Sequence, residues 1–490
     1  EDRTLSQIIY KNNIAGKFQT SQKFLDDSSG IDAPPVATGA EASNSDVDKA
    51  VDAARNAFNG DWSNMPLKTR CDLLEKVALT IEKRFDDFVD AEVADTGKPV
   101  NQAKLIDIPR GAENFRFFSN YIKISKTESY EMQHEDGSKV INYSIRKPKG
   151  VIAIIAPWNL PLLLLTWKVA PALAAGNCIV AKPSEETPGT ATLLAEVVDE
   201  VGFPDGVFNI VHGYGPKSTG EYLTKHHDID AITFTGESAT GSEIMKSAAD
   251  GVKPVSFELG GKNAAIIFDD ADFDAAIEGT LKSVFANCGQ VCLCTERVYV
   301  HQSIYEKFLE KFKSEAEKIT ENWPQKESLD FGPLISKEHR EKVLKAFSTA
   351  ITDGGILEVG GGIPIFDDKR DSGSWIEPTI FTGLGEKSDL IKNEVFGPVC
   401  HVTPFESENE VLKKANDSKY GLAAAIWTKD INKAHLISSK LNVGVVWVNS
   451  WYLRDLRTPF GGMKLSGIGR EGGQHSLDFY SELTNVCVKS

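Results

Sequence analysis

The chain has 490 residues, of which 41% are hydrophobic and 25% are charged, enough for roughly two or three compact α/β domains. Its 70 acidic residues outnumber its 54 basic ones, and the resulting formal charge of -16 argues against binding to nucleic acid or to a membrane surface. The seven cysteines are odd in number and widely spread, which indicates free thiols and predicts a cytoplasmic protein. The apolar run at 151–156 is too short to span a bilayer.

From about residue 150, short apolar strands alternate with helical segments. The expected strands are 151–156, 178–181, 207–211 and 231–234, and the expected helices are 162–174 and 190–201. Continuous apolar strands that alternate with helices predict a parallel sheet covered on both faces. We therefore predict an α/β fold with a doubly wound, Rossmann-like nucleotide-binding domain.

A second alternating region runs from about Val255 to Phe460, with an expected strand at 264–268 and an expected helix at 304–317. Polar β-type sequence at 126–145 and an isolated strand at 483–488 interrupt the pattern. They predict either an intersubunit sheet or a β-flap within one subunit. The expected organisation is a cofactor-binding domain of residues 1–125 and 146–254, an oligomerisation flap at 126–145, a catalytic domain at 255–460, and a C-terminal return with an oligomerisation strand at 461–490.

Three cysteines lie within seven positions, at Cys288, Cys292 and Cys294. A zinc site would require further cysteine or histidine ligands nearby, and the surrounding sequence offers none, so no metal is expected. Cys288 and Cys294 are expected to be buried as small apolar side chains, which is the usual fate of a cysteine. Cys292 is the candidate nucleophile, because the segment around it belongs to a larger set of motifs.

Seven motifs resemble those of the aldehyde dehydrogenase superfamily, in the same order and at the same spacing. They are Ala156-Pro-Trp-Asn159, Lys182-Pro-Ser-Glu185, Phe234-Thr-Gly236, Phe257-Glu-Leu-Gly-Gly-Lys262, Gly289-Gln-Val-Cys292, Glu394-Val-Phe-Gly-Pro398 and Pro459-Phe-Gly-Gly-Met-Lys-Leu-Ser-Gly467. The similarity covers essentially the whole chain. It implies the family's fold, with a Rossmann-like cofactor domain, an α/β catalytic domain and a small β oligomerisation flap, and it implies a homodimer or homotetramer.

The resemblance implies three catalytic residues, and the chemistry of each suits its role. The thiolate of Cys292 would add to an aldehyde carbon. The side-chain amide of Asn159 and the backbone N–H of Cys292 would bind the oxyanion, although Asn159 could instead be a simple helix cap. Glu258 would activate the water that hydrolyses the thioester. Glu258 argues against a CoA-acylating enzyme, and the three residues together argue against a non-catalytic protein of the same fold.

NAD is the cofactor that the resemblance implies, although the chain lacks the G-x-G-x-x-G motif. Gly236 and Gly241 would flank the start of a helix near the pyrophosphate. Lys182 and Glu185 match positions that hold the adenosine ribose, and a carboxylate near the 2′-oxygen favours NAD over NADP. Glu237 is not included, because a carboxylate would repel a phosphate. The remaining implied cofactor contacts are Ile155, Pro157, Trp158, Ser184, Gly215, Phe234, Thr235, Leu259, Glu394 and Phe396, of which the last two would hold the nicotinamide riboside.

Arginines in the expected substrate region indicate an aldehyde that carries a carboxylate. Arg110 lies in an expected helix, and Arg454 and Arg457 lie in the loop before Pro459. Arginine offers a planar, bidentate fit to a carboxylate, whereas ordinary surface ion pairing is the alternative interpretation. Trp167 completes the implied substrate-binding set.

Local sequence narrows the resemblance to the muconic semialdehyde dehydrogenases. The similar segments are Asp107-Ile-Pro-Arg110, Phe285-Ala-Asn-Cys-Gly-Gln-Val-Cys292, Val446-Trp-Val-Asn-Ser-Trp451 and Leu453-Arg-Asp-Leu-Arg457. The resemblance implies that the substrate is 2-aminomuconate 6-semialdehyde, which carries a carboxylate far from its aldehyde group. The 2-hydroxy compound is nearly isosteric and remains the alternative, because a hydrophobic pocket discriminates poorly between such pairs.

Overall fold

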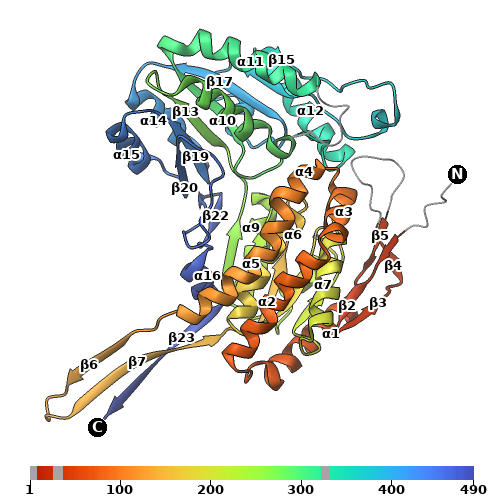
Figure 1. The fold of residues 1–490 in the computed structure, drawn as a ribbon, viewed down its shortest axis with the longest axis vertical. Coiled ribbons are helices and arrows are strands. Elements are labelled where there is room, and N and C mark those ends of the chain that lie inside the picture. The colour runs from red at the N-terminus through yellow and green to blue at the C-terminus, as the bar shows by residue number, and fades with distance from the viewer. Residues whose placement is uncertain (1–7, 26–36, 322–330) are drawn as a thin grey trace.

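The computed structural model describes residues 8–25, 37–321 and 331–490. The molecule has two parts, each a large sheet with its own helices, which are called the first and second layers below. The two layers follow one another along the longest axis of the molecule, and a narrow three-stranded sheet projects from one end (Figure 1). The predicted α/β class is confirmed, and each strand and helix expected from the apolar pattern is present within a few residues of its expected limits.

The first sheet has eight strands in the order β22-β12-β11-β8-β9-β10-β2-β3. Its five central strands, which include β8 and two strands on each side of it, are parallel to one another. Because the chain passes from β8 to β9 and β10 on one side and then to β11 and β12 on the other, a topological switch point lies beside β8. The strands are β2 (Asn12–Ile14), β3 (Lys17–Gln19), β8 (Val151–Ile155), β9 (Cys178–Lys182), β10 (Phe208–Ile210), β11 (Ala231–Thr235), β12 (Val255–Glu258) and β22 (Gly467–Ile468).

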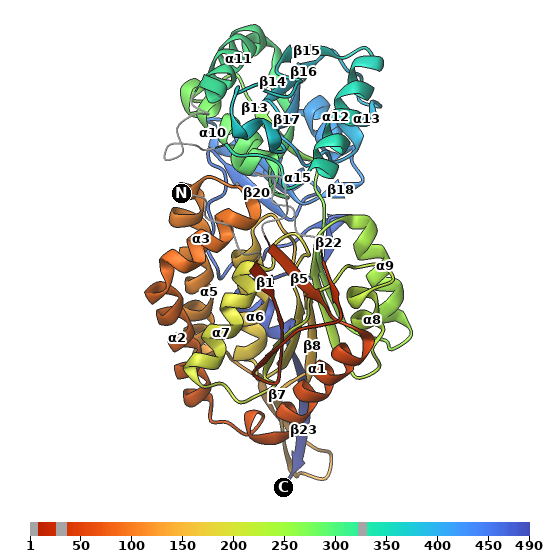
Figure 2. The ribbon, with the colours of Figure 1, turned by 90° about the vertical axis from the view of Figure 1, so that its right-hand side faces the viewer.

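Helices cover both faces of this sheet (Figure 2). On one face lie α2 (Leu67–Lys83), α3 (Phe85–Thr96), α5 (Ile108–Tyr121), α6 (Pro161–Ala174) and α7 (Gly189–Val201). On the other lie α1 (Asn44–Ala57), α8 (Thr219–Lys225) and α9 (Ser238–Ala249). Between α3 and α5 the chain forms α4 (Val100–Gln102) and one π-helical turn at Ala103–Asp107. A small sheet of β1 (Ile8–Tyr10), β4 (Lys23–Phe24) and β5 (Ala37–Glu41) lies at the amino-terminal edge.

The second layer is built on a seven-stranded sheet in the order β15-β16-β17-β14-β13-β19-β20. Its strands are β13 (Asn263–Ile267), β14 (Thr295–His301), β15 (Ile356–Val359), β16 (Thr379–Thr382), β17 (Val399–Phe405), β19 (Ala423–Trp427) and β20 (Val445–Val448). Its helices are α10 (Phe273–Phe285), α11 (Tyr305–Glu321), α12 (Lys337–Thr352), α13 (Asp389–Lys392), α14 (Glu408–Asn416) and α15 (Ile431–Lys440). The first sheet extends beyond residue 254, because β12 pairs with β11, and the second sheet begins at β13.

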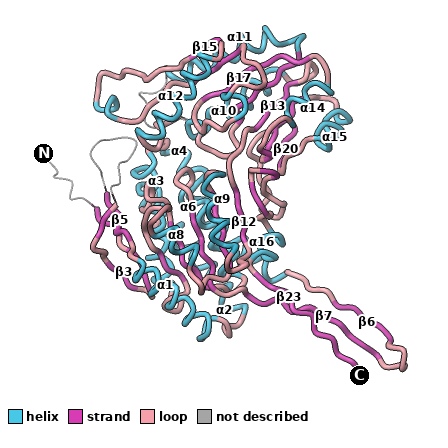
Figure 3. The backbone as a smooth tube through the Cα atoms, turned by 180° about the vertical axis from the view of Figure 1, so that it is seen from behind, coloured by secondary structure: helices cyan, strands magenta, loops and turns pink. Residues whose placement is uncertain are grey.

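The projecting sheet consists of β6 (Ser129–Gln133), β7 (Lys139–Pro148) and β23 (Ser481–Lys489), in the order β23-β7-β6 (Figures 1 and 3). Within this chain, β23 pairs with β7 along its whole length, so the two isolated strands expected from the sequence meet in one subunit. The short strands β18 (Tyr420–Gly421) and β21 (Met463–Lys464) pair with each other, and α16 (Gly473–Phe479) leads into β23. Among the described residues, no helix is long and apolar enough to cross a membrane.

Candidate active site

A pocket between the two layers brings together residues from both. It lies beyond the carboxyl ends of the parallel strands of the first sheet, where ligands bind in open α/β sheets. Cys292 enters from the loop before β14, and Glu258 is the last residue of β12. The pocket is lined by Arg110, Leu160, Leu163, Leu164, Trp167, Glu258, Val291, Cys292, Leu293, Trp447, Tyr452, Arg454 and Phe460. The described residues contain no cluster of side chains suited to a metal ion.

Cys292 is half-buried, whereas Cys288 and Cys294 are fully buried, as their sequence context predicts. Burial raises the pKa of the Cys292 thiol well above its usual value, and the nearby carboxylates of Glu258 and Glu394 raise it further. The thiol is therefore the resting form in this structure. A base or an added positive charge is needed before the thiolate can act as a nucleophile.

Glu258 is buried, and its Oε1 has no hydrogen-bond partner within the described part of the chain. Burial raises the pKa of this carboxyl well above its usual value, and the charge of Glu471 raises it further. Glu471 forms a buried ion pair of 2.5 Å with Lys168, which also donates to the Thr233 hydroxyl at 3.0 Å. A carboxylate with a raised pKa is a stronger base, which suits Glu258 to accepting a proton from water.

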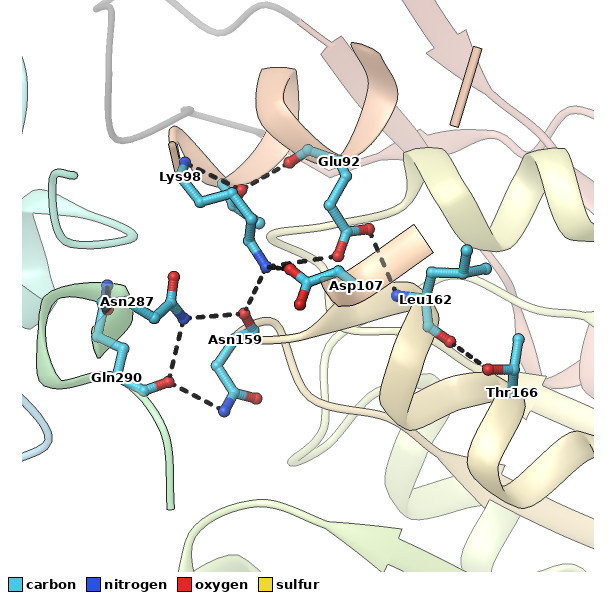
Figure 4. A network of polar contacts seen from close by, with 9 residues as sticks. Glu92, Lys98, Asp107, Asn159, Leu162, Thr166, Asn287 and Gln290 are labelled. Carbon is cyan, nitrogen blue, oxygen red and sulfur yellow. Dashed lines mark hydrogen bonds and ion pairs between the residues drawn. The ribbon is translucent and has the colours of Figure 1, made fainter. Parts of the chain in front are cut away.

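Asn159 lies in the loop between β8 and α6, beside the segment that leads to Cys292 (Figure 4). Its Nδ2 donates to the backbone carbonyl of Gln290 at 3.0 Å. An amide NH₂ has two hydrogens, so this bond fixes the side chain and leaves one hydrogen for another acceptor. The buried position of Asn159 fits a donor to an oxyanion, and its side chain makes no capping bond to α6.

Two guanidinium groups converge on one aromatic ring at the wall of the pocket. Arg110 lies over the ring of Trp167 at 5.3 Å, and Arg454 lies over the same ring at 5.2 Å. Arg110 donates through Nε to Asn114 and Arg454 through Nη1 to Thr458, but neither forms an ion pair with any residue that the structure describes. Nη2 of Arg454 is buried without a partner there.

The electrostatics of this pair follow from burial. Desolvation lowers the pKa of Arg110 to about 10, and the neighbouring Arg454 adds to the shift. Both guanidiniums remain charged at neutral pH, so the pocket wall holds two cations that an anionic group would stabilise. Arg457 differs, since its exposed guanidinium forms an ion pair of 2.7 Å with Asp455 and lines an adjoining surface pocket rather than the one that holds Cys292.

The residues expected to hold a dinucleotide lie at the same edge of the first sheet. Ile155, Lys182 and Thr235 end β8, β9 and β11, and the buried hydroxyl of Thr235 has no partner in the described ranges. Pro157 and Trp158 follow β8, Ser184 and Glu185 follow β9, Phe234 and Gly236 lie at the end of β11, and Leu259 follows β12. Lys182 lies 3.6 Å from Glu185.

Two glycines and the start of a helix lie among the residues expected to hold the cofactor. A Cβ on Gly241 would lie 2.7 Å from the Leu259 side chain, so glycine permits the close approach of α9 to the end of β12. A Cβ on Gly215 would meet no atom within 4 Å, so space is open there. Glu237 is exposed and makes no side-chain cap at the start of α9. The first N–H groups of this helix therefore fit a phosphate.

A loop of the second layer, between α13 and β17, carries the two residues expected to hold the nicotinamide riboside. Glu394 Oε1 accepts from the backbone N–H of Gly261 at 2.8 Å, and burial raises the pKa of this carboxyl to about 8. Phe396 packs edge-on against Trp158, with ring centroids 5.4 Å apart. The loop is held by the buried ion pair of Lys262 and Glu296, because Glu296 accepts from the Phe396 N–H at 2.9 Å.

Sequence reasoning did not find Glu471, Lys168, Lys262, Glu296 or Lys98. Lysine and glutamate are seldom buried, and buried charges require partners that are distant in sequence. Glu471 lies 303 residues from Lys168. For Lys168, the only local sign was its position inside the apolar segment 162–174, where a cation is out of place.

Comparison with known proteins identifies the family. The model of the aldehyde dehydrogenase family matches residues 18–486. A 2-aminomuconic 6-semialdehyde dehydrogenase from Pseudomonas sp. is 54% identical, with 98% of each chain covered, and a 2-hydroxymuconic semialdehyde dehydrogenase from Pseudomonas sp. (strain CF600) is 53% identical, with 98% and 99% covered. The NAD⁺ complex of an aldehyde dehydrogenase from Bacillus cereus is 37% identical, with a TM-score of 0.92 over 99% of this chain and 96% of that one.

The chain belongs to the aldehyde dehydrogenase family. The resemblance seen in its seven motifs is therefore confirmed, as is the expected enzyme class, an oxidoreductase that acts on aldehydes. The similarity covers nearly the full length of this chain and of its relatives.

Proposed function

We propose that the protein oxidises 2-aminomuconate 6-semialdehyde, or a closely related carboxylated aldehyde, to the carboxylic acid with NAD⁺ and water. The observation that supports this substrate class is the pair Arg110 and Arg454. Both guanidiniums lie over Trp167 on the wall of the Cys292 pocket, and neither has a carboxylate partner within the described residues. Two partly buried cations without ion-pair partners carry a desolvation cost, which a substrate carboxylate would offset.

The first steps use Cys292 and Asn159. Binding of the substrate carboxylate at the arginines places the aldehyde toward Cys292, because all three residues line one pocket. The Cys292 thiol first gives up its proton to solvent water, and the thiolate sulfur then attacks the carbonyl carbon, whose π electrons move to oxygen to form a thiohemiacetal anion. The free amide hydrogen of Asn159 and the backbone N–H of Cys292 stabilise that oxyanion.

NAD fits the sheet edge at the switch point, where the buried Thr235 hydroxyl has no partner within the described residues and the first N–H groups of α9 have no side-chain cap. Lys182 and Glu185 would hold the adenosine ribose, and Glu394 and Phe396 would hold the nicotinamide riboside. When bound, NAD⁺ supplies the hydride acceptor that converts the thiohemiacetal to a thioester.

Hydrolysis of the thioester is assigned to Glu258. The ionised carboxylate accepts a proton from water, the resulting hydroxide adds to the thioester carbon, and the C–S bond breaks to release the acid and the Cys292 thiolate. Arg454 and Lys168 favour the ionised form of Glu258, whereas burial and Glu471 oppose it.

Steady-state kinetics test this proposal. NADH formation is measured with 2-aminomuconic and 2-hydroxymuconic semialdehydes and with an uncharged aldehyde of similar length. A kcat/KM at least about 100-fold higher for the carboxylated compounds is expected from two charge-assisted contacts. Equal values for the uncharged aldehyde would contradict the assignment of the arginines.

The 2-hydroxy compound is the alternative substrate, and the relatives named above include both kinds of enzyme. We assign the 2-amino compound on the slightly higher identity. The assignment is reversed if kcat/KM for the 2-hydroxy compound exceeds that for the 2-amino compound in the same assay.

We propose that the protein is a cytoplasmic homodimer or homotetramer that assembles through the projecting sheet. Strands β6 and β23 form its outer edges, and Tyr130, Met132, Ile141 and Leu483 are exposed on it. Such apolar residues on a thin sheet favour contact with a second copy. The seven free cysteines fit a reducing compartment. A monomeric mass by analytical ultracentrifugation at micromolar concentration would contradict the assembly.

A further inference from the structure

The backbone carbonyl of Asn159 accepts hydrogen bonds from two side chains, one from each of the two layers. Nζ of Lys98 donates to it at 3.0 Å, and Nδ2 of Asn287 donates to it at 3.1 Å (Figure 4). Together with the bond from its own side chain to Gln290, three hydrogen bonds hold this residue. The orientation of its peptide is therefore determined by groups outside the β8–α6 loop.

Lys98 is buried in a charged cluster rather than at the surface. Its Nζ forms an ion pair of 2.5 Å with Asp107 and lies 3.4 Å from Glu92, and all three side chains are at most 1% exposed. Lysine is rarely buried to this degree, and burial of its charge is costly unless its partners are well placed. Glu92 also accepts from the N–H of Leu162, at 3.4 Å, in the first turn of α6.

The chain segment that carries Asp107 also carries Arg110, one of the two proposed substrate-binding arginines. Asp107 ends the π-helical turn Ala103–Asp107, and Arg110 follows it in the first turn of α5. π-Helical turns within α-helices are rare and occur frequently at functional sites. The turn thus directs Asp107 toward Lys98 and the neighbouring helical turn carries Arg110 to the pocket wall.

The second side chain that holds the Asn159 carbonyl, Asn287, comes from the loop that leads to Cys292. Asn287 has a left-handed backbone conformation, with φ 51° and ψ 37°, which asparagine tolerates better than most residues. It also donates to the Gln290 carbonyl at 3.3 Å, the same atom that binds the Asn159 amide. The loop that leads to Cys292 and the Lys98 cluster therefore hold Asn159 between them.

We infer that Lys98, held by Asp107, is a positioning residue that fixes the Asn159 peptide so that the remaining amide hydrogen faces the oxyanion. This inference rests on the proposed role of Asn159. Neither Lys98 nor Asn159 is among the residues that line the pocket, and Lys98 reaches the site through its direct hydrogen bond to Asn159. Loss of the contact should slow thiohemiacetal and thioester formation without weakening substrate binding, because Arg110 and Arg454 remain in place.

The test compares Lys98→Met with Lys104→Met, which replaces an exposed lysine in the π-helical turn. The pre-steady-state burst of NADH is measured together with KM for a muconic semialdehyde and for NAD⁺. We expect Lys98→Met to slow the burst about 10-fold to 100-fold, the loss that a misplacement of about 1 Å causes, with both KM values within about 2-fold of wild type. Lys104→Met should match the wild type.

A double-variant cycle separates positioning from general damage. If Lys98 acts through Asn159, Lys98→Met in an Asn159→Ala background should cause almost no further loss. The inference is overturned if folded Lys98→Met shows a wild-type burst. It is also overturned if the losses in burst rate of the two single variants multiply in the double variant. A wild-type burst in Asn159→Ala would instead overturn the proposed function of Asn159.

Asp107→Asn provides the second variant should Lys98→Met fail to fold. It keeps the size of the side chain but removes the charge that holds Lys98. We expect a burst slowed about 3-fold to 10-fold with unchanged KM values. The lost charge-assisted contact is the one between Asp107 and Lys98, which acts on Asn159 only through Lys98. An unchanged burst in Asp107→Asn would overturn the role assigned to Asp107 and, if Lys98→Met is unfolded, the inference as a whole.

Discussion

Three charged side chains with shifted pKa values lie at the proposed active site: Glu258 is buried, and Arg110 and Arg454 are partly buried. Glu258, Arg110 and Arg454 line one pocket, and burial shifts the pKa of each away from its usual value in the direction of the neutral form. The cost of burying these groups is expected at functional sites, where perturbed pKa values are matched to a task. Two predictions follow from single residues.

Replacement of Arg110 or Arg454 by alanine should reduce kcat/KM for muconic semialdehydes. Each guanidinium would make a charge-assisted hydrogen bond worth about 1.5 to 3 kcal/mol, so a loss of about 10-fold to 100-fold is expected for each. Arg116→Ala, in the same helix as Arg110 but paired with Glu75 and Glu82 outside the pocket, is the control. Equal losses for an uncharged aldehyde would mean that the two arginines are structural.

The pH dependence of hydrolysis should follow Glu258. Because burial and Glu471 raise its pKa, the hydrolysis rate should rise with pH above the usual glutamate range. Lys168, Arg454 and Arg470 act in the opposite direction. Glu471→Gln removes the like charge, lowers the pKa of Glu258 and should move the rising limb to lower pH. Single-turnover hydrolysis measures this shift, with the exposed Glu278→Gln as control; a shift to higher pH would refute it.

For helices and strands, the apolar pattern of the sequence predicted their positions correctly, but it did not reveal the buried polar contacts between them. The five short, mainly apolar runs form β8, β9, β10, β11 and β13, because a strand buried on both faces suits a short run of this kind. The pairing of β12 with β11 and the π-helical turn before α5 could not be predicted. β12 is also paired with β22, more than 200 residues away, and the π-helical turn ends at Asp107, whose ion-pair partner Lys98 lies outside the turn.

Gly289 shows how tightly two loops meet near the nucleophile. Its φ is +71°, and a Cβ there would lie 1.9 Å from the backbone oxygen of Gly397, beside Phe396. Gly289→Ala should lower the free energy of unfolding by roughly 3 kcal/mol or more, from left-handed strain plus a backbone clash. Gly202→Ala has a similar φ but no neighbour within 4 Å, so it should cost only about 1 kcal/mol. Urea unfolding of both variants measures the difference, and equal costs would exclude a clash at Gly289.

For the whole molecule, the order and spacing of seven motifs predicted the family, and the comparisons confirm it. The catalytic and cofactor residues were assigned by motif transfer, and the structure places Cys292 and Glu258 in one pocket, with Asn159 bonded to the adjoining loop. The supporting charges Lys98, Lys168 and Glu296 were missed because a single sequence does not reveal partners that come together only on folding. The position of the pocket between two layers explains how residues from distant segments come to line it.

The most direct test of the proposed mechanism is intact-protein mass spectrometry of Glu258→Gln after mixing with NAD⁺ and a muconic semialdehyde. Without the general base, the thioester should accumulate, and the protein should gain one acyl group that peptide mapping places on Cys292. The double variant with Cys292→Ala should gain nothing. An NADH burst in Glu258→Gln with no adduct on Cys292, or full steady-state turnover in that variant, would contradict the thioacyl route and the role of Glu258.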